Sequence, residues 1–323
     1  MSAGDRSRRI GALEEAPADV DAVAHRVVHG GELREPTRID DAVQARLEEL
    51  VELAPLHNRP AVDGIAEARL ALPGVPHVAV FDTAFHATMP PIATTYALPA
   101  EWRRRVRRYG FHGLSVAWSA ERVRVPRLVV CHLGGGCSVT AVRDGRSVDT
   151  TMGFTPLEGV PMATRPGSVD PGALVYLLRH GVTPDALDEA IEHRSGLLGL
   201  SGVSGDVAEL ERSNADGARV ALDVFAYRVA AAVGSMAVAL GGLDALVFTA
   251  GIGEHSAAVR RDVCTRLRFL GVELDAGAND SAAGDAEIAA AGTDVRVAVI
   301  QAREELVAAR VVRELLDCGE PAT

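Results

Sequence analysis

LVVCHLGGGCSVTAVRDGRSVDTTMGFTPLEGVPMATRPGSVDP, residues 128–171, is the stretch that decides the fold. Its first six residues, 128–133, form an apolar run that predicts a buried strand. The run ends at three glycines, 134–136, and residues 138–142 then alternate between polar and apolar as far as the hairpin signal Asp144-Gly145. We therefore expect a strand, a glycine turn, a second strand, a tight turn and a third strand. Two interpretations of the glycines stay open: a plain tight turn, or a loop whose N–H groups approach phosphate oxygens.

Chain length and net charge limit the functions that this stretch can have. The chain has 323 residues, of which 48% are hydrophobic, so it can bury a large core and is expected to form two domains. A net charge of -11 argues against a general nucleic-acid binder. All 33 basic residues are arginine, because the sequence contains no lysine. This composition excludes a P-loop lysine, a Schiff-base lysine and a Ser-x-x-Lys nucleophile.

The cysteines and the most apolar segments point to an intracellular protein. Cys131, Cys137, Cys264 and Cys318 show no C-x-x-C spacing, so we expect reduced thiols in a cytoplasmic protein. The N-terminal residues MSAGDRSRRI have no apolar core of a signal peptide. The most apolar uncharged stretch, residues 229–243, is too short for a bilayer of about 30 Å, so no membrane span is expected.

The N-terminal third alternates between strand and helix patterns. Residues 1–19 are polar and expected to be loose, and 20–28 read as a strand. Asp40 can cap a helix, and a second helix follows with Val62, Ile65 and Leu70 on its apolar stripe. Residues 77–81 are a buried strand with Asp82 at its carboxyl end, where open α/β sheets place ligand-binding groups. The alternation predicts the α/β class.

The arginine-rich segment 101–109 admits two interpretations. Five arginines beside Trp102 could indicate RNA or DNA binding, but a short run in an acidic protein favours one solvated helix face. Beyond the central hairpins, we expect a loop at 199–206, helices at 171–179, 184–191, 217–240 and 303–316, and strands at 245–250 and 295–300.

A second glycine segment, residues 251–255, follows the strand expected at 245–250. Ser256 is the expected cap of a helix with Val259, Val263, Leu267 and Leu270 on one face. A strand that runs through glycines into a helix N-terminus is a natural seat for an anion or a nucleotide.

Several motifs together resemble the acetate kinase family, which has the actin-like kinase fold. They occur in family order and are HRVVHGGE (25–32), PLHN (55–58), FDTAFH (81–86), RYGFHG (108–113), residues 152–170, and FTAGIGE (248–254). The resemblance implies a two-domain actin-like (ribonuclease H-like) α/β fold whose N-terminal domain lacks its first strands. That domain would comprise residues 1–84, completed by the helix at 303–323, and residues 85–302 would bind nucleotide and form the dimer contact.

The resemblance also implies a reaction. The γ-phosphoryl group of ATP would pass to acetate, giving acetyl phosphate and ADP reversibly, with Mg²⁺ as cofactor. Propionate or butyrate is an alternative acceptor, and a non-catalytic relative that binds nucleotide or a partner is an alternative function. The implied partners are a small carboxylate, ATP or ADP and a second copy in a homodimer, with neither nucleic acid nor membrane.

Family positions map residue by residue onto this sequence. Asp82 matches the acid/base position, but a carboxylate substrate is already ionised at pH 7, so we expect Asp82 to orient substrate or a metal-bound water. Arginines suit the site because a guanidinium fork holds a carboxylate or phosphoryl group with paired bonds. The implied catalytic residues are Asp82, His112 and Arg165; the substrate residues are Arg26, Val28, Leu56, Phe111 and Pro156; the metal ligand is Glu304, or Glu305 in a shifted register. The implied nucleotide residues are His132, Leu133, Gly134, Gly135, Gly136, Asp206, Val207, Ala208, Gly251, Ile252, Gly253, Glu254 and His255.

Each assignment has a plainer alternative. Arg26 and Arg165 could be surface ion pairs, and Asp82 alone would more often be a turn or cap residue. His25 and His29 could bind a metal from one strand face, although no third ligand has clear spacing. Phe111 and Pro156 would by themselves be core residues.

Departures from the family pattern predict weak activity. Only 24 residues precede His25, and the family's Asn-x-Gly-Ser-Ser-Ser-x-Lys phosphate loop is absent, which fits a start codon placed too late or a truncated relative. Gly135 replaces an asparagine, Ala208 an arginine and His255 an asparagine. Losing one oriented donor commonly costs about 10² to 10³ in rate, so we expect little turnover from this chain, and the sheet edge left unpaired would favour association.

Overall fold

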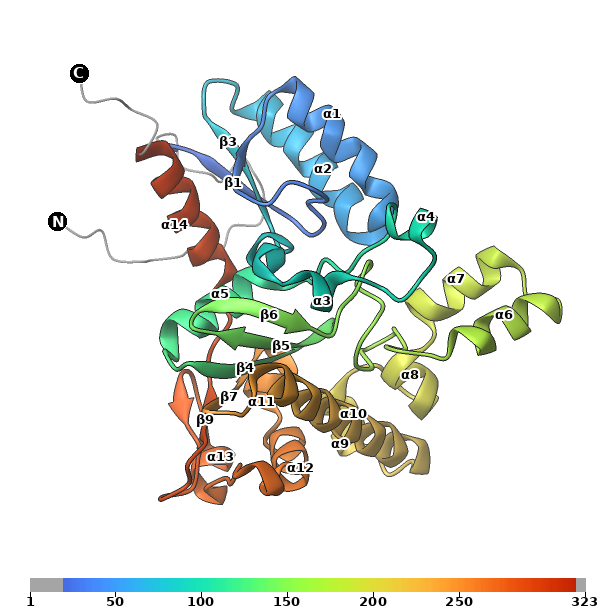
Figure 1. The fold of residues 1–323 in the computed structure, drawn as a ribbon, viewed down its shortest axis with the longest axis vertical. Helices are drawn as coiled ribbons and strands as arrows, with labels where there is room; N and C mark the ends of the chain where they lie inside the picture. The colour runs from blue at the N-terminus through green and yellow to red at the C-terminus, as the bar shows by residue number, and fades with distance from the viewer. Residues whose placement is uncertain (1–19, 318–323) are drawn as a thin grey trace. The chain divides into compact units, whose positions relative to one another are not determined.

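The computed structural model describes residues 20–317, without the side chains of Pro55 and Leu56. These residues fall into two compact units (Figure 1). Of the described residues, unit 1 contains 20–87, 111–118 and 303–317, and unit 2 contains 88–110 and 119–302. The expectations for residues 1–19 and for Cys318 lie outside the described part of the chain.

Unit 1 is a small sheet with helices. Its strand order is β1-β3-β2, where β1 and β3 are parallel and β2 is antiparallel to β3. The elements are β1 (Val23–Val27), β2 (Thr37–Arg38), α1 (Asp41–Glu49), a 3-10 turn (Leu50–Leu53), α2 (Pro55–Ala71), β3 (His77–Phe81), a 3-10 turn (Ala84–Thr88), the start of α5 (Gly113–Arg122) and α14 (Glu304–Asp317). The parallel register pairs Val27 with Phe81, so both strands end at the same edge.

Apolar side chains from strands and helices form the core of unit 1. Val27 and Phe81 pack with Leu47 of α1 and with Val62 and Ile65 of α2. Asp40 caps α1 as expected, because its side chain accepts a hydrogen bond from the N–H of Val43.

One position of the expected α2 stripe is wrong. Leu70 is 84% exposed, whereas Val62 and Ile65 are buried. Leu70 lies one residue before the end of the helix, beyond the part of its face that reaches the sheet core.

Unit 2 contains the larger, six-stranded sheet. Its elements are α3 (Pro91–Thr94), α4 (Ala100–Arg103), β4 (Arg127–Leu133), β5 (Cys137–Arg143), β6 (Arg146–Thr150), α6 (Pro171–Arg179), α7 (Pro184–His193), α8 (Gly196–Ser201), α9 (Val207–Arg212), α10 (Asp216–Leu240), β7 (Ala245–Thr249), α11 (Ala250–His255), α12 (Ala257–Arg266), a 3-10 turn (Arg268–Leu270), α13 (Ala276–Ser281), β8 (Ala286–Glu287) and β9 (Arg296–Val299). The strand order is β6-β5-β4-β7-β9-β8, with β4, β7 and β9 parallel.

The central hairpins follow the expected pattern. Leu133 pairs with Cys137, which places the three glycines at the tip between β4 and β5. Asp144 and Gly145 both have positive φ, 49° and 78°, as the tight turn before β6 requires. Ser256 caps α12 as predicted, through a hydrogen bond from Val259.

Three other segments differ from expectation. The arginine-rich segment is not one helix, because α4 ends at Arg103 and the following residues form turns and irregular chain. Part of the loop expected at 199–206 belongs to α8. The glycine segment 251–255 is itself the short helix α11, entered through Ala250 with φ 65°.

Helix α10 has 25 residues and is therefore longer than the apolar stretch 229–243, which was expected to be too short to span a membrane. By length and composition it is the single described helix that could cross a membrane. Its buried residues, including Phe225, Val229 and Val233, lie on the side that packs along β4 and β5. It is thus a core helix of unit 2.

Candidate functional site

Arg26 is the centre of a charged cluster in unit 1. It is the fourth residue of β1, and Asp82 directly follows the neighbouring strand β3. Its Nε and Nη2 atoms donate to the two carboxylate oxygens of Asp82 at 3.0 and 2.7 Å. Its Nη1 donates to Oε2 of Glu304, the first residue of α14, at 2.5 Å. Parallel strands that end together and the start of one helix therefore assemble three of the predicted site residues.

The protonation states of this cluster follow from burial and charge. Burial opposes the charge on Arg26, but the Asp82 and Glu304 carboxylates outweigh it, and the pKa of Arg26 is raised. Burial raises the pKa of Glu304 to about 7, with Arg26 acting in the opposite direction. A guanidinium has five N–H donors, and the described contacts use three of them. Two N–H groups, one on each Nη, remain for a ligand.

Glu304 offers the oxygen that a metal ion would need. Its Oε1 is buried and has no hydrogen-bond partner in the described structure. Among residues 20–317, no group of three His, Cys, Asp or Glu side chains could hold a metal ion on its own. Mg²⁺ usually takes one or two protein carboxylates and completes its shell with water and substrate phosphates. One free carboxylate oxygen fits that requirement, and it belongs to Glu304, whereas Glu305 is exposed.

His112 and Phe111 lie beside the same strand end. Gly113 donates its N–H to the carbonyl of Asp82 at 2.9 Å, and a Cβ there would come within 2.2 Å of that oxygen. Glycine is therefore required for the segment to approach β3, and His112, directly before it, takes a positive φ of 60°. Phe111 is buried, with its ring edge-on to His29 at 5.4 Å between centroids.

The remaining predicted residues of unit 1 divide into two groups. Val28 follows β1 and is half-buried, whereas the side chain of Leu56 lies outside the described residues. The alternative metal pair His25 and His29 is not supported. A ring nitrogen of His25 lies 2.9 Å from one of His77, and Nδ1 of His29 accepts the N–H of Gly31 at 3.0 Å.

In unit 2, the two glycine segments lie side by side. A Cβ at Gly134 would be 3.5 Å from Cβ of Ala250 and 3.9 Å from the nitrogen of Gly251. None of the three hairpin glycines has a positive φ, so unusual backbone angles are not what requires them. The N–H of Gly134 donates to Gly136, while the N–H of Gly135 has no partner among the described residues. A Cβ at Gly135 would meet no atom within 4 Å, so the tip is open to close approach.

The strand residues before these glycines contribute differently. His132 is 8% exposed, and Leu133 is fully buried, with its side chain in the core. Leu133 can therefore offer a ligand only its backbone.

The loop that carries Arg165 joins this region. Arg165 is 8% exposed, and its Nη1 donates to the carbonyl of Pro156 at 2.7 Å. Burial lowers the pKa of Arg165, with Glu192 acting in the opposite direction. Ala163 donates its N–H to the carbonyl of Gly135 at 3.3 Å. Arg165, Pro156 and the glycine hairpin therefore belong to one continuous region of unit 2, which is not a set of surface ion pairs.

The third predicted nucleotide segment reaches the same loop. A Cβ at Gly205 would lie 2.7 Å from the carbonyl of Ala163. The following residue, Asp206, caps α9 by accepting the N–H of Glu209. Val207 is buried and Ala208 is exposed. The segment is thus close to the loop of Arg165, although the Asp206 carboxylate already has a structural partner.

Sequence reasoning missed the side chains that hold these segments in place. Arg260 is 1% exposed, and its Nη1 donates to the carbonyls of Gly253 and Glu254 at 3.0 and 2.9 Å, which holds the end of α11. Buried Asn58 binds both the N–H and the carbonyl of His29 at 3.0 Å, beside the exit of β1. Asn58 lies within the PLHN motif, so that motif was a usable signal, whereas Arg260 resembles any arginine of a solvated helix.

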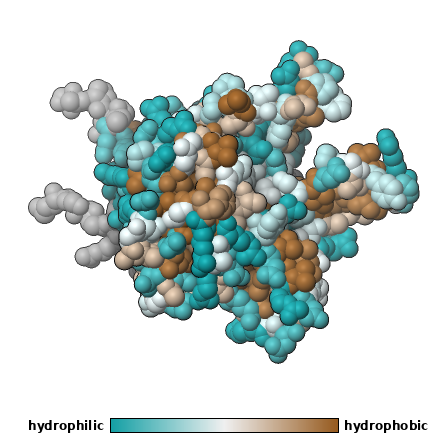
Figure 2. Space-filling model, turned by 60° about the horizontal axis from the view of Figure 1, so that its bottom comes forward, coloured by the Kyte–Doolittle hydropathy of each residue, from teal (hydrophilic) through white to brown (hydrophobic). Residues whose placement is uncertain are grey.

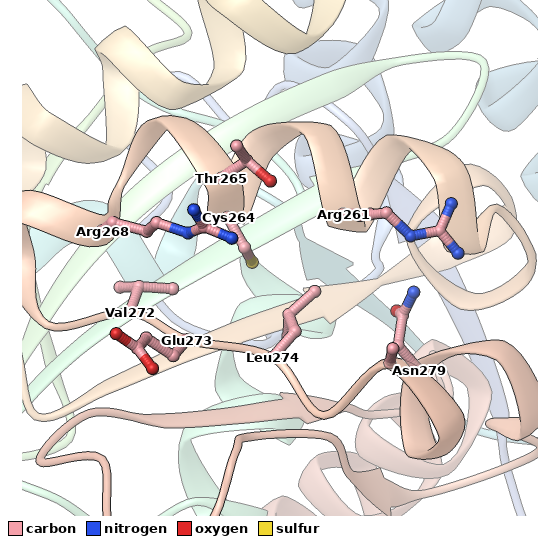
Figure 3. Close-up of a pocket in the computed structure, with 9 residues that line it drawn as sticks. Arg261, Cys264, Thr265, Arg268, Val272, Glu273, Leu274 and Asn279 are labelled. Atoms are coloured by element: carbon pink, nitrogen blue, oxygen red, sulfur yellow. The ribbon is translucent and has the colours of Figure 1, made fainter.

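Unit 2 has two cavities whose lining includes none of the site residues assigned from the sequence. One of about 320 Å³ lies between α12 and the chain that follows it, where Arg261, Arg268 and Asn279 surround Cys264 and Leu274 (Figure 3). Arg261 is paired with Asp280, and Asn279 with Arg260. The second, of about 420 Å³, is mainly apolar and is lined by Tyr96, Phe154, Leu157, Glu158, Leu174 and Ile191, among others.

Comparison with known proteins identifies the family of this chain. The sequence matches the Acetokinase family over residues 9–310. Acetate kinases of Gloeobacter violaceus and Heliobacterium modesticaldum are 49% and 47% identical over 309 and 313 residues, which cover 91% and 92% of this chain and 76% and 79% of theirs.

Solved structures share the fold. Acetate kinase of Porphyromonas gingivalis superposes with a TM-score of 0.86 at 38% identity and covers 95% of this chain and 80% of its own. A propionate kinase of Francisella tularensis gives a TM-score of 0.85 at 37% identity and covers 90% and 78%. With a family match along nearly the whole sequence and relatives close to half identical, this chain belongs to the acetokinase family.

Proposed function

We propose that this chain transfers the γ-phosphoryl group of ATP to acetate, giving acetyl phosphate and ADP, in a reversible reaction. The observation that carries the proposal is the Arg26 guanidinium at the ends of β1 and β3. It is held by Asp82 and Glu304 and has one N–H left on each terminal nitrogen. Those two donors are available to a carboxylate or a phosphoryl group. The names of the similar proteins, acetate kinases, agree with this acceptor.

The reaction depends more on neutralising negative charge than on a general base. An ionised carboxylate oxygen attacks the γ-phosphorus, and the bond to the bridging oxygen of ADP breaks. Because the nucleophile is already deprotonated, catalysis rests on positioning and on neutralising the transferred group. Asp82 keeps Arg26 in place through two hydrogen bonds, and Arg165 and His112 supply further positive charge or donors to the phosphoryl group.

ATP is the proposed phosphoryl donor. The open glycine tip with the unpaired N–H of Gly135 suits the phosphates, and α11 with the segment 206–208 suits the adenosine. Mg²⁺ would be held by Oε1 of Glu304 and would neutralise phosphate charge when bound. The nucleotide-binding role therefore falls to residues 85–302, and the metal ligand to the C-terminal helix that completes the N-terminal domain.

The acyl group of the substrate needs an apolar wall. In unit 1, Phe111 is buried and Val28 is half-buried, and we assign both to the methyl group of the substrate, together with Leu56 and Pro156 from the family pattern. The structural similarity to a propionate kinase favours propionate as the second candidate acceptor. One methylene is worth only about 1 to 3 kcal/mol in such a pocket, so comparing kcat/KM for the two acids decides between them.

We further propose a cytoplasmic homodimer. Helix α6 has no buried residue in the described structure. It carries large hydrophobic side chains that are 39% to 59% exposed, namely Val175, Tyr176, Leu177 and Leu178. Hydrophobic surface is visible at the right of Figure 2, where α6 and α7 lie in Figure 1. Burying such a face against a second copy removes apolar area from water. Light scattering should show twice the chain mass, and Leu177→Asp should give monomers.

The activity is best tested in the direction that forms ATP. Acetyl phosphate and Mg-ADP are supplied, and ATP is detected with luciferase, which measures even the slow turnover expected from this chain. Arg26→Ala should lower the rate by about 10² to 10³. The matched control is Arg34→Ala, which removes an exposed arginine paired with Glu32. Equal rates for Arg26→Ala and the parent refute the proposal. ADP binding without ATP formation supports the non-catalytic alternative.

A further inference from the structure

The guanidinium of Arg165 depends on the loop that it closes. Its Nη1 donates to the carbonyl of Pro156, nine residues earlier, at 2.7 Å, and the contact is buried. The direction of this guanidinium is therefore set by where the Pro156 carbonyl lies. Whatever fixes the chain around Pro156 also fixes Arg165.

Glu158 closes the chain around Pro156. Its Oε1 accepts from Nη2 of Arg108 at 2.7 Å, and its Oε2 accepts from the Tyr96 hydroxyl at 2.6 Å. The same hydroxyl accepts the N–H of Phe154 at 2.9 Å. A ring of hydrogen bonds thus runs from Phe154 through Tyr96 to Glu158, with Pro156 midway along the backbone that completes it. We call Tyr96, Arg108 and Glu158 the loop clamp.

Arg108 anchors the start of the same loop. Its Nη1 donates to the carbonyls of Thr150, Thr151 and Met152 at 3.0, 2.9 and 3.0 Å. The side chain of Arg108 is only 16% exposed, so this arginine is not part of the solvated run expected from the sequence. One guanidinium therefore ties the β6 exit to the carboxylate of Glu158.

The loop clamp requires a glycine at position 153. A Cβ at Gly153 would lie 1.9 Å from Oε2 of Glu158 and 2.2 Å from the Tyr96 hydroxyl oxygen. Any side chain there would push the clamp apart. Burial, with Glu158 adding to it, raises the pKa of Tyr96, so the hydroxyl remains a donor at physiological pH. Both bonds to the carboxylate are charge-assisted and are stronger than neutral ones.

We propose that Glu158 is a positioning residue for Arg165, acting through the carbonyl of Pro156. The inference rests on the proposed function for its kinetic meaning, since Arg165 is there assigned to the transferred phosphoryl group. Glu158 need not touch the substrate. The clamp holds the 153–158 segment in the one arrangement that presents the Pro156 carbonyl to the guanidinium.

The first test reads Arg165 directly and needs no enzymatic activity. Protein labelled with ¹⁵N-arginine gives an Nε–Hε signal for Arg165, assigned by its loss in Arg165→Lys. Glu158→Gln should shift or broaden this signal, because a neutral amide holds Arg108 and Tyr96 less firmly. The matched control is Glu101→Gln, which removes an exposed carboxylate on α4 and should leave the signal in place. An unchanged Arg165 signal in folded Glu158→Gln overturns the inference.

A second variant guards against misfolding of the first. Tyr96→Phe removes one hydroxyl and leaves the bond between Arg108 and Glu158, so it should give a smaller shift in the same direction. If Tyr96→Phe folds and leaves the Arg165 signal unaltered, the clamp does not position Arg165.

Kinetics then separate positioning from general stability. Glu158→Gln should lower kcat/KM for acetyl phosphate about tenfold, which is about 1.4 kcal/mol, with KM for ADP within about twofold of the parent. In an Arg165→Lys background, Glu158→Gln should lower kcat/KM for acetyl phosphate by less than about twofold, because the guanidinium through which Glu158 acts is already absent. A further tenfold loss in that background overturns the inference. A shifted Arg165 signal in a chain without phosphoryl transfer would remove the proposed function alone.

Discussion

His86 should make unit 1 less stable in mild acid. The residue lies in the 3-10 turn Ala84–Thr88, is 1% exposed, and its Nε2 lies 2.8 Å from the carbonyl of Phe111. That carbonyl accepts only, so a neutral imidazole protonated on Nε2 satisfies the contact. Burial lowers the pKa of His86 to about 4, from 6.5 in an unfolded chain. The folded state therefore keeps this ring neutral where an unfolded chain would protonate it.

The direction and the size of this pH effect on the free energy of unfolding follow from proton linkage. Between pH 6.5 and 4 the unfolded state binds more protons than the folded state, so stability is complete above pH 6.5 and is lost as the pH falls. The full difference of 2.5 pKa units corresponds to about 3.4 kcal/mol. At pH 5 the loss relative to pH 8 is about 2 kcal/mol, from the ratio of the two protonation terms.

Tryptophan fluorescence can report on unit 1 alone. The chain has two tryptophans, the exposed Trp102 in unit 2 and the buried Trp118 in unit 1. In a Trp102→Phe background, urea unfolding followed at Trp118 gives the stability at pH 8 and pH 5. At a slope of about 2 kcal/mol/M, the midpoint should fall by about 1 M on account of His86. His86→Gln keeps a donor for Phe111 and does not titrate, so it should remove this component.

The comparison between variants isolates His86 from other groups. Burial also lowers the pKa of half-buried His25 to about 4, with His77 adding to it. The parent and His86→Gln both retain His25, so this effect cancels when the two are compared. The control His193→Gln replaces an exposed histidine on α7 and should leave the pH dependence of Trp118 unfolding as it is. If the parent and His86→Gln lose equal stability between pH 8 and pH 5, burial of a neutral His86 is not the cause, and the reasoning fails.

Three further changes test the candidate site. Gly135→Asn should raise kcat/KM for ADP about tenfold in the ATP-forming assay, because a Cβ there meets no atom within 4 Å and the amide adds a donor. Glu304→Gln should raise the Mg²⁺ concentration for half-maximal rate about tenfold or more, measured by titration at fixed nucleotide, since its free Oε1 is the proposed ligand. Arg260→Lys should lower Tm by about 2 to 4 °C in a thermal scan and weaken the stabilisation by ADP, because one ammonium cannot replace the three guanidinium nitrogens that together bind Gly253, Glu254 and Asn279.

Local patterns in the sequence were enough for the central hairpins, the strand before Asp82 and the family. The apolar run before three glycines and the Asp144-Gly145 turn each involve neighbouring residues, and the structure has the hairpins where these patterns placed them. Asp82 at the end of β3 was predictable for the same reason, because a strand pattern shows where the strand stops. Local periodicity reflects which face of an element is buried, so it survives in a single sequence.

Side-chain partners far apart in the chain were decided by tertiary structure alone. Arg26 and Glu304 are 278 residues apart, and Tyr96 and Glu158 are 62 apart. Arg108 shows why such contacts escape sequence reasoning, since Arg103, Arg104 and Arg105 of the same segment are exposed while Arg108 binds three carbonyls inside unit 2. A charged side chain is as compatible with solvent as with a buried partner, and only the packing of distant elements supplies that partner. For this protein, the sequence by itself determined the central hairpins, the glycine turns and the family, and the folded chain determined which carboxylate meets which arginine.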